Sequence, residues 1–259
     1  MSGRAIGAAQ TTPRRDDWQA NLAEHLRLVR AASEAGAGLL VFPELSLTGY
    51  ELDLASQVAF SESDTRLDPL RALADSLRIT LIVGAPVVIA QQLHIGAFII
   101  GSTGALALYT KQHLGAFAAD VNPGGPVPPP EPSIFREGIL DPLVDVHGEL
   151  AAVAICADTG KPSHPQAAAN RGAQLYLASM FFTPGEVEAE HARLQAYAAR
   201  HRLMVVASNY GGPTGSLPSG GHSAIWSSEG ALITRIAHTR SGLALAHPTG
   251  TGWHGEVRD

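Results

Sequence analysis

The sequence predicts a layered α/β protein, in which two β-sheets pack together and helices cover their outer faces. Apolar runs of strand length alternate with amphipathic helical patterns along most of the chain, and no internal repeat or interdomain linker interrupts them. The 259 residues are 45% hydrophobic and 16% charged, so the chain can bury a large core and wholesale disorder is excluded. We therefore expect residues 1–259 to form one domain.

The first half of the chain predicts a β/α alternation followed by a β-meander. A helix is expected over 17–35, with Trp18, Leu22, Leu26 and Val29 on one stripe, and a second helix over 65–77. Residues 79–110 contain no charged side chain, but Gly, Pro and Gln divide them into strand-length pieces, which favours buried strands over a membrane helix. The expected strands are 39–42, 79–83, 87–89, 94–100 and 105–109.

The second half contains an irregular segment and then resumes the alternation. Prolines at 123, 126, 128, 129, 130 and 132 exclude a helix or a central strand from residues 115–138. We expect a loop that covers a site, with a surface linker as the alternative. Beyond it we expect helices over 165–171 and 186–201, and strands at 151–155, 175–178, 203–207, 222–227, 231–236 and 243–246.

Composition and motifs exclude several classes of function. A net charge of −6 without a basic run argues against nucleic-acid binding. The single cysteine, Cys156, rules out an internal disulfide and a thiolate zinc site, and the histidines lack metal-ligand spacing, so no metal is expected. The N-terminal apolar stretch is too short for a signal peptide, which leaves the cytoplasm as the expected location. Neither a Gly-x-Ser-x-Gly elbow nor a Walker loop is present, and Gly250-x-Gly252-x-x-Gly255 has no helix to open.

Three reactive residues stand where predicted strands end. Glu44 follows strand 39–42 and a proline, Lys111 follows the run 105–110, and Cys156 ends strand 151–155 beside Asp158. Because ligands of α/β sheets bind beyond the carboxyl ends of strands, these side chains could converge on one site. The ordinary interpretations are that Glu44 and Lys111 are the first solvated residues after a strand and that Cys156 is a small buried hydrophobe.

The segments around these residues resemble known signatures. Phe-Pro-Glu-Leu-Ser-Leu-Thr-Gly-Tyr (42–50), Tyr-Thr-Lys-Gln-His-Leu (109–114) and Ala-Ile-Cys-Ala-Asp (154–158) are similar to the three signatures of the nitrilase superfamily of carbon-nitrogen hydrolases. They occur in the family's order and at similar separations. Later pieces, Asn-Arg-Gly-Ala (170–173) and Ala-Ser-Asn (207–209), extend the resemblance from about residue 5 to residue 246.

The resemblance implies a four-layer α-β-β-α sandwich and a set of catalytic roles. Cys156 would attack the substrate as a thiolate, Glu44 would take the thiol proton as general base, and Lys111 would stabilise the oxyanion. The backbone N–H of Ala157 would be a second oxyanion donor. The family also uses a second glutamate between the lysine and the cysteine. Residues 131–138 are similar to its Glu-x-x-x-Phe-x-x-Gly pattern, which favours Glu131 over Glu137.

One departure from the family pattern affects the expected substrate. Where many relatives have an arginine after the Cys-aromatic-Asp sequence, this chain has Gly160, which argues against the members that act on acidic ω-amides. Side chains near the motifs are expected to line a substrate pocket, with simple packing as the alternative: Tyr50, Phe117, Phe181, Phe182 and Asn209.

The resemblance therefore implies an enzyme that hydrolyses a small non-peptide C–N bond, with a carboxamide as the first candidate. Nitriles, N-carbamoyl amines and ureido compounds would use the same residues. Two rival classes of protein are an acyltransferase that uses the same thioester and a non-catalytic binding protein of the same fold. We expect no metal or organic cofactor, and a homodimer because family members usually pair.

Overall fold

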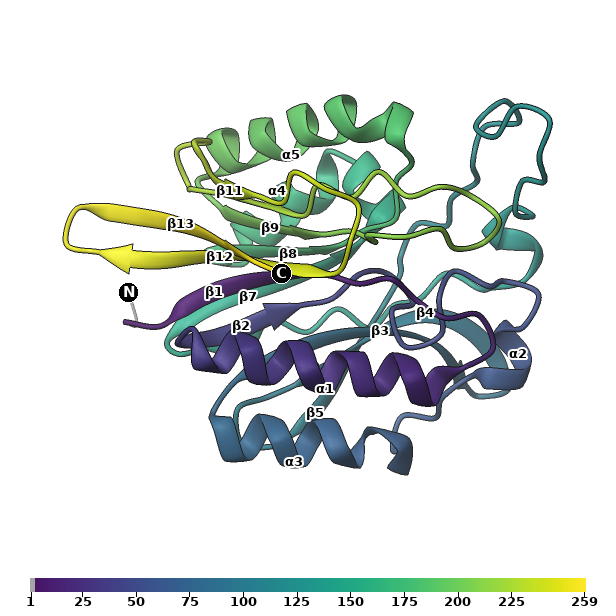
Figure 1. Cartoon of the computed structure of the whole chain (residues 1–259), viewed down its shortest axis with the longest axis horizontal. Helices are drawn as coiled ribbons and strands as arrows, with labels where there is room; N and C mark the ends of the chain where they lie inside the picture. Colours follow the sequence, from purple (N-terminus) through teal and green to yellow (C-terminus); the bar gives the residue numbers. More distant parts are fainter. Residues whose placement is uncertain (1–2) are drawn as a thin grey trace.

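Two stacked β-sheets with helices on both outer sides make up the computed structural model, which describes residues 3–259 (Figure 1). Helices α1 (Trp18–Glu34) and α3 (Asp68–Leu77) cover one sheet. Helices α4 (Ser163–Asn170) and α5 (Val187–His201) cover the other. The layered α/β arrangement predicted from the sequence is confirmed.

The first sheet has seven strands in the order β13-β12-β1-β2-β3-β4-β5. Its centre is parallel, because β1 pairs with β2 and β2 with β3 in parallel, while the remaining pairs are antiparallel. The strands are β1 (Ala5–Gln10), β2 (Ala37–Val41), β3 (Thr80–Ile89), β4 (Gln92–Ile100), β5 (Leu106–Thr110), β12 (Gly242–Thr249) and β13 (Gly252–Arg258).

The second sheet has six strands in the order β11-β10-β9-β8-β7-β6, with a parallel centre of β7, β8 and β9. Its strands are β6 (Val144–Val146), β7 (Glu149–Ile155), β8 (Leu175–Ser179), β9 (Met204–Ser208), β10 (Ala224–Trp226) and β11 (Leu232–Arg235). The short elements are α2 (Ala55–Val58) and 3-10 turns at Thr65–Leu67, Glu131–Ser133, Cys156–Gly160 and Pro184–Glu186.

The central strands are apolar on both faces because each face packs against another layer. In β2, Leu39 and Val41 pack between the sheets, whereas Leu40 packs toward the helices. Ile155 of β7 likewise faces the space between the sheets, and Ala154 faces the helices. Alternate residues of a strand point to opposite faces, so a strand buried on both sides reads as a continuous apolar run.

Some predicted boundaries differ from the structure. The strands expected at 79–83 and 87–89 are one strand, β3, which runs through Pro86. Strand β2 pairs only with the start of β3, at Thr80–Ile82. Pro86 lies beyond this paired stretch. The N–H that proline lacks is therefore not needed for a hydrogen bond to β2. Strands β1, β6 and β13 were not predicted. The glycines of the Gly250–Gly255 pattern lie in and after the β12–β13 turn and open no helix.

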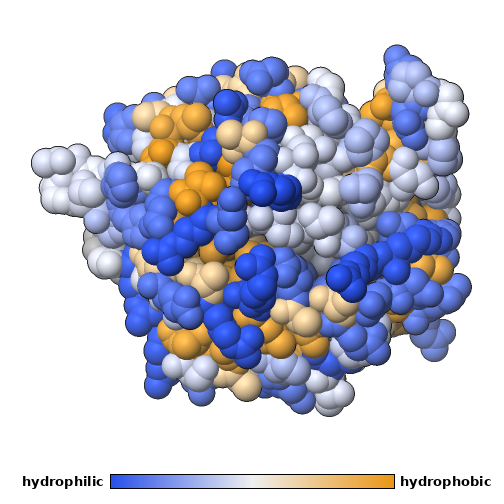
Figure 2. Space-filling view, viewed as in Figure 1, coloured by the Kyte–Doolittle hydropathy of each residue, from blue (hydrophilic) through white to orange (hydrophobic). Residues whose placement is uncertain are grey.

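The surface carries mixed hydropathy, and the charge-free segment predicted as strands is not a helix. In Figure 2, hydrophilic residues and small hydrophobic areas are interspersed over the face shown. Among residues 3–259, none of the helices has the length and apolar character needed to cross a membrane. The charge-free residues 79–110 instead form β3, β4 and β5.

Candidate active site

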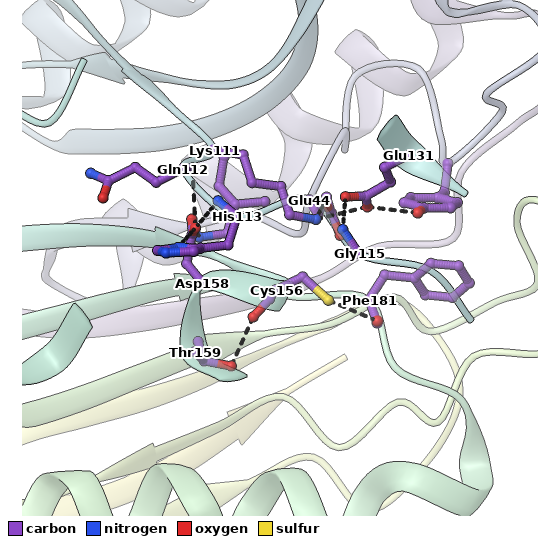
Figure 3. Close-up of polar contacts among 12 residues, drawn as sticks. Glu44, Lys111, Gln112, His113, Gly115, Glu131, Cys156, Asp158, Thr159 and Phe181 are labelled. Carbon is purple, nitrogen blue, oxygen red and sulfur yellow. Dashed lines mark hydrogen bonds and ion pairs between the residues drawn. The ribbon is translucent and has the colours of Figure 1, made fainter. Parts of the chain in front are cut away.

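The three strand-end residues predicted to converge do lie together. Lys111 Nζ donates to Glu44 Oε1 at 2.6 Å and to Glu131 Oε1 at 2.7 Å, and the Lys111 and Glu44 side chains are fully buried (Figure 3). Cys156 lines the same cavity as Lys111 and Glu131. The interpretation of Glu44 and Lys111 as solvated strand ends is therefore wrong for their positions in this fold.

Glu44 is held in a tight turn that follows β2. Leu45 has a φ of 52°, in the left-handed region, and the Glu44 N–H donates to Met180 O at 3.3 Å. The turn packs directly on β3 at Gly84, where an added Cβ would lie 2.4 Å from Leu45 N. The Tyr210 hydroxyl also donates to the Glu44 carbonyl. Only a glycine in β3 lets the turn approach closely enough to bury Glu44.

Lys111 is fixed by the backbone on both of its sides. Its N–H donates to Ile95 O at 2.9 Å, and its carbonyl accepts from Gly138 N at 2.8 Å. An added Cβ on Gly138 would lie 2.1 Å from Thr110 Oγ1, so no side chain fits there. Gly138 is the last residue of the Glu-x-x-x-Phe-x-x-Gly pattern, and the close contact with Thr110 explains why this position requires a glycine.

Glu131 is buried and hydrogen-bonded through both carboxylate oxygens. Besides Lys111, Oε1 accepts from the Tyr50 hydroxyl at 2.7 Å, and Oε2 accepts from Gly115 N at 2.7 Å. Glu137 is exposed. The proline-rich segment 115–138 is therefore not a surface linker, because it carries Glu131 into the site. Its one helical piece is the three-residue 3-10 turn at Glu131–Ser133.

Cys156 stands at the turn where β7 gives way to the 3-10 turn Cys156–Gly160. Its φ is 39°, in the left-handed region that is costly for a residue with a side chain. Its thiol donates to Phe181 O at 3.3 Å. Such strained positions persist only where the surroundings hold them, and they cluster at functional sites.

A buried carboxylate, Asp158, ties the lysine segment to the cysteine turn. Oδ1 accepts from the N–H groups of Gln112 at 3.1 Å and His113 at 2.8 Å. Oδ2 accepts from the Ile155 N–H at 3.0 Å and the Tyr109 hydroxyl at 2.7 Å. From the sequence, Asp158 was noted as a neighbour of Cys156 and as the end of the third signature, but no role was assigned to it. The one feature of the sequence that could have indicated this role is an acidic residue so close to the end of a buried strand.

We predict that Asp158→Ala lowers the free energy of unfolding by about 3 kcal/mol or more, because several buried donors lose their acceptor at about 1–3 kcal/mol each. Urea unfolding followed by circular dichroism measures the change. Asp145→Ala is the control: Asp145 is exposed and accepts one backbone hydrogen bond, from Gly148 N. Equal losses in the two variants would contradict the role assigned to Asp158.

Burial controls the charges of the site. Burial raises the pKa of Glu44 to about 7, although the nearby Lys111 ammonium opposes the rise. Burial alone would lower the pKa of Lys111, but the Glu44 and Glu131 carboxylates outweigh it and raise that pKa above its ordinary value. Burial, followed by the nearby Glu44 carboxylate, raises the pKa of the Cys156 thiol well above its ordinary value. The resting site thus holds a protonated thiol beside a charged ammonium.

The cavity at this site is small, at about 90 Å³. Glu44 is not one of the lining residues, but it contacts Lys111, which is, and its Oε2 is buried without a hydrogen-bond partner within residues 3–259. The lining consists of Tyr50, Lys111, Gly115, Ala116, Phe117, Glu131, Cys156, Ala157, Phe181, Phe182, Glu186 and Glu190.

The expected pocket residues are thus mostly in place. Tyr50, Phe117, Phe181 and Ala157 line the cavity. Asn209 does not: its amide exchanges hydrogen bonds with the Phe182 backbone at 3.2 Å and so positions the wall from behind.

Two further acidic residues line the cavity, Glu186 and Glu190, and neither was singled out from the sequence. They belong to the segment 186–201 predicted as helix, but nothing in its pattern indicated which face meets the site. Within the part of the chain that the structure describes, no three His, Cys, Asp or Glu side chains are grouped to hold a metal ion.

Comparison with known sequences places this site in context. A model of the carbon-nitrogen hydrolase family matches residues 5–248. The glutamine-dependent NAD(+) synthetase of Mycobacterium bovis is 30% identical over 245 residues, which cover 88% of this chain and 36% of the synthetase. A hydrolase in the pqqF 5' region of Pseudomonas protegens is 29% identical over 88% of this chain and 77% of its own length. The chain thus spans about a third of the synthetases it matches.

Solved structures of an amidase from Nesterenkonia sp. AN1 share the fold. One is a mutant with covalent addition of the acetamide moiety of fluoroacetamide at its active-site cysteine. It aligns with a TM-score of 0.82 and 27% identity, covering 95% of this chain and 90% of that one. A second mutant, in complex with butyramide, aligns with the same TM-score and identity over 95% and 91% of the two chains.

Proposed function

Because this chain belongs to the carbon-nitrogen hydrolase family, we propose that it hydrolyses a small carboxamide and releases ammonia through a thioester at Cys156. The observation that carries the proposal is the buried Lys111 ammonium, held by Glu44 and Glu131 at the wall of a small cavity that Cys156 also lines. The similarity to an amidase that binds butyramide supports the choice of a carboxamide.

The first step forms the bond between sulfur and carbon. The amide carbon lies against Cys156 Sγ, and the carboxylate of Glu44 takes the thiol proton through its unpartnered Oε2 as the sulfur attacks. The carbonyl π electrons move onto oxygen. The Lys111 ammonium and the Ala157 N–H stabilise this oxyanion. A general base is required because the thiol is protonated in the resting site.

The second step breaks the C–N bond. The oxyanion collapses to a thioester, and protonated Glu44 returns its proton to the departing nitrogen, which leaves as ammonia. Water then attacks the thioester, with Glu44 again taking a proton, and the second oxyanion collapses to release the carboxylic acid and restore the thiol. Each proton taken by Glu44 is returned, so the enzyme ends unchanged.

Glu131 serves this cycle by positioning Lys111. With Glu44 and Glu131 on one ammonium, Lys111 remains charged when Glu44 is protonated in mid-cycle. The Tyr50 hydroxyl and the Gly115 N–H hold Glu131 itself in place. A donor that stays charged throughout the cycle is suited to stabilise an oxyanion in both steps.

The raised pKa of Glu44 predicts how activity depends on pH. Glu44 accepts a proton only as a carboxylate, so kcat/KM rises tenfold per pH unit below about pH 7, the Glu44 pKa, and then reaches a plateau. Ammonia release from a small amide at pH 5–9 measures the profile. Glu44→Gln removes this limb together with most of the activity. A profile that is flat between pH 5 and 8 would contradict the assignment of Glu44 as base.

The test of function is a comparison of substrate classes. We expect ammonia from acetamide, propionamide or butyramide, and from Cys156→Ala none above background. Matched nitriles and N-carbamoyl amines test the rival substrates of the same residues, and product analysis with added hydroxylamine tests acyl transfer. Release from nitriles or carbamoyl compounds but not from amides would overturn the carboxamide proposal. Glutamine belongs in the panel because relatives are named for its use.

The homodimer and the cytoplasmic location stay predictions.

A further inference from the structure

We propose that Glu190, together with Glu186, makes the pocket select amides whose acyl portion carries a positively charged amino group and reject those that carry a carboxylate. This inference rests on the proposed function and narrows its substrate to small amino-acyl amides. Both residues line the cavity that Cys156 lines. Glu186 ends the 3-10 turn that leads into α5, and Glu190 lies in the first turn of that helix.

The hydrogen bonding of Glu190 is incomplete. Its Oε1 accepts from Arg193 Nη2 at 2.7 Å, but its Oε2 is buried and has no partner among the described residues. Burial also raises the pKa of this carboxyl. A buried acceptor without a donor costs about 1–3 kcal/mol, so a bound ammonium group that supplied the donor would be favoured here.

The side chains around the cavity carry more negative than positive charge, which also favours a cationic substrate. The lining contains one ammonium, Lys111, against the carboxylates of Glu131, Glu186 and Glu190. Lys111 is already paired with Glu44 and Glu131. Adding the neighbouring Glu44 and Arg193 contributes one charge of each sign, so the excess of negative charge stays the same. Within residues 3–259, the cavity wall therefore offers no unpaired cation to bind a substrate carboxylate.

Helix stability explains only part of this arrangement. Thr183 donates to Glu186 Oε2 through its N–H and its hydroxyl, both at 2.8 Å, which caps the helix start. Acidic side chains in the first turn also interact well with the helix dipole. That benefit applies equally to Glu188, which is exposed. It does not account for a buried oxygen without a donor on a side chain, Glu190, that lines the cavity.

The test compares three amides of similar length in the wild type at pH 7.5: 3-aminopropanamide, which is cationic, butyramide, which is neutral, and succinamate, which is anionic. We expect kcat/KM to be at least about tenfold higher for the cation than for butyramide, and lower again for the anion. Glu190→Gln should reduce the ratio between cation and butyramide by about tenfold. Glu188→Gln, in the same helical turn but exposed, should leave the ratio as in the wild type.

Equal kcat/KM for the three amides in the wild type, or an unchanged ratio in Glu190→Gln, would overturn the inference while leaving amide hydrolysis intact. If the wild type hydrolyses none of them, the proposed function fails instead. Binding of the three amides to Cys156→Ala by calorimetry then decides the inference separately: tighter binding of 3-aminopropanamide supports it, and equal binding overturns it. Thermal unfolding of each variant confirms that the fold is retained.

Discussion

Replacing Cys156 with alanine is expected to lower kcat/KM for small amides by at least about 10⁴-fold, as the loss of a covalent nucleophile does in other hydrolases. The protein should still fold, because the change removes one partly buried sulfur whose thiol makes only a weak hydrogen bond, to Phe181 O at 3.3 Å, within residues 3–259. Ammonia release measures the activity, and urea unfolding measures the stability.

The size of this effect follows from the chemistry of the site. Without the sulfur, hydrolysis would need water to attack the amide directly, and no thioester would divide the reaction into two easier steps. Cys156→Ser is an informative companion, because a serine hydroxyl fits the space but gives up its proton far less readily. If the alanine variant kept activity within tenfold of the wild type, a direct attack by water would replace the thioester mechanism.

Replacing Lys111 with methionine is expected to affect both activity and stability. The loss of one oxyanion donor lowers kcat by about 10²–10³-fold. The free energy of unfolding should fall by about 3–5 kcal/mol, because Glu44 and Glu131 are left as buried carboxylates without their cation. The stability loss should shrink as the pH falls through the raised pKa of Glu44, since protonation of that carboxyl removes one of the unpaired charges.

Lys161→Met is the matched control, because Lys161 is exposed and takes no part in the site. It should leave both activity and unfolding free energy close to those of the wild type. Urea unfolding at pH 5 and pH 8, with ammonia release under the same conditions, separates the two effects of Lys111→Met. Wild-type stability for Lys111→Met at pH 8 would contradict the buried ion pairs on which the proposed mechanism depends.

The layers of the fold were predictable because the central strands are buried on both faces. Strands β2 and β7 contain the continuous apolar runs predicted at 39–42 and 151–155, and both begin two residues earlier than predicted. Strand β13 was missed because its residues are mostly half-exposed and polar, and only its pairing with β12 makes it a strand. Strand β6 is three residues long and offers no period to detect.

The candidate site was predictable to the extent that its residues end strands. Cys156 directly follows such a strand pattern, and Glu44 follows one after a single proline. Glu131 was favoured by a motif whose final glycine, Gly138, is explained by its close contact with Thr110. Glu190 could not be found this way. Along the sequence it resembles any acidic residue in the first turn of a helix, and its place on the cavity wall depends on how α5 packs on the second sheet.

The thioester itself can be detected by intact-protein mass spectrometry of acid-quenched mixtures of the protein with a small amide, sampled during turnover and alongside an ammonia assay. We expect a mass increase equal to the acyl group on the wild type, no increase on Cys156→Ala, and ammonia from the wild type alone. Ammonia released equally by both proteins, with no acyl adduct on either, would contradict Cys156 as the nucleophile.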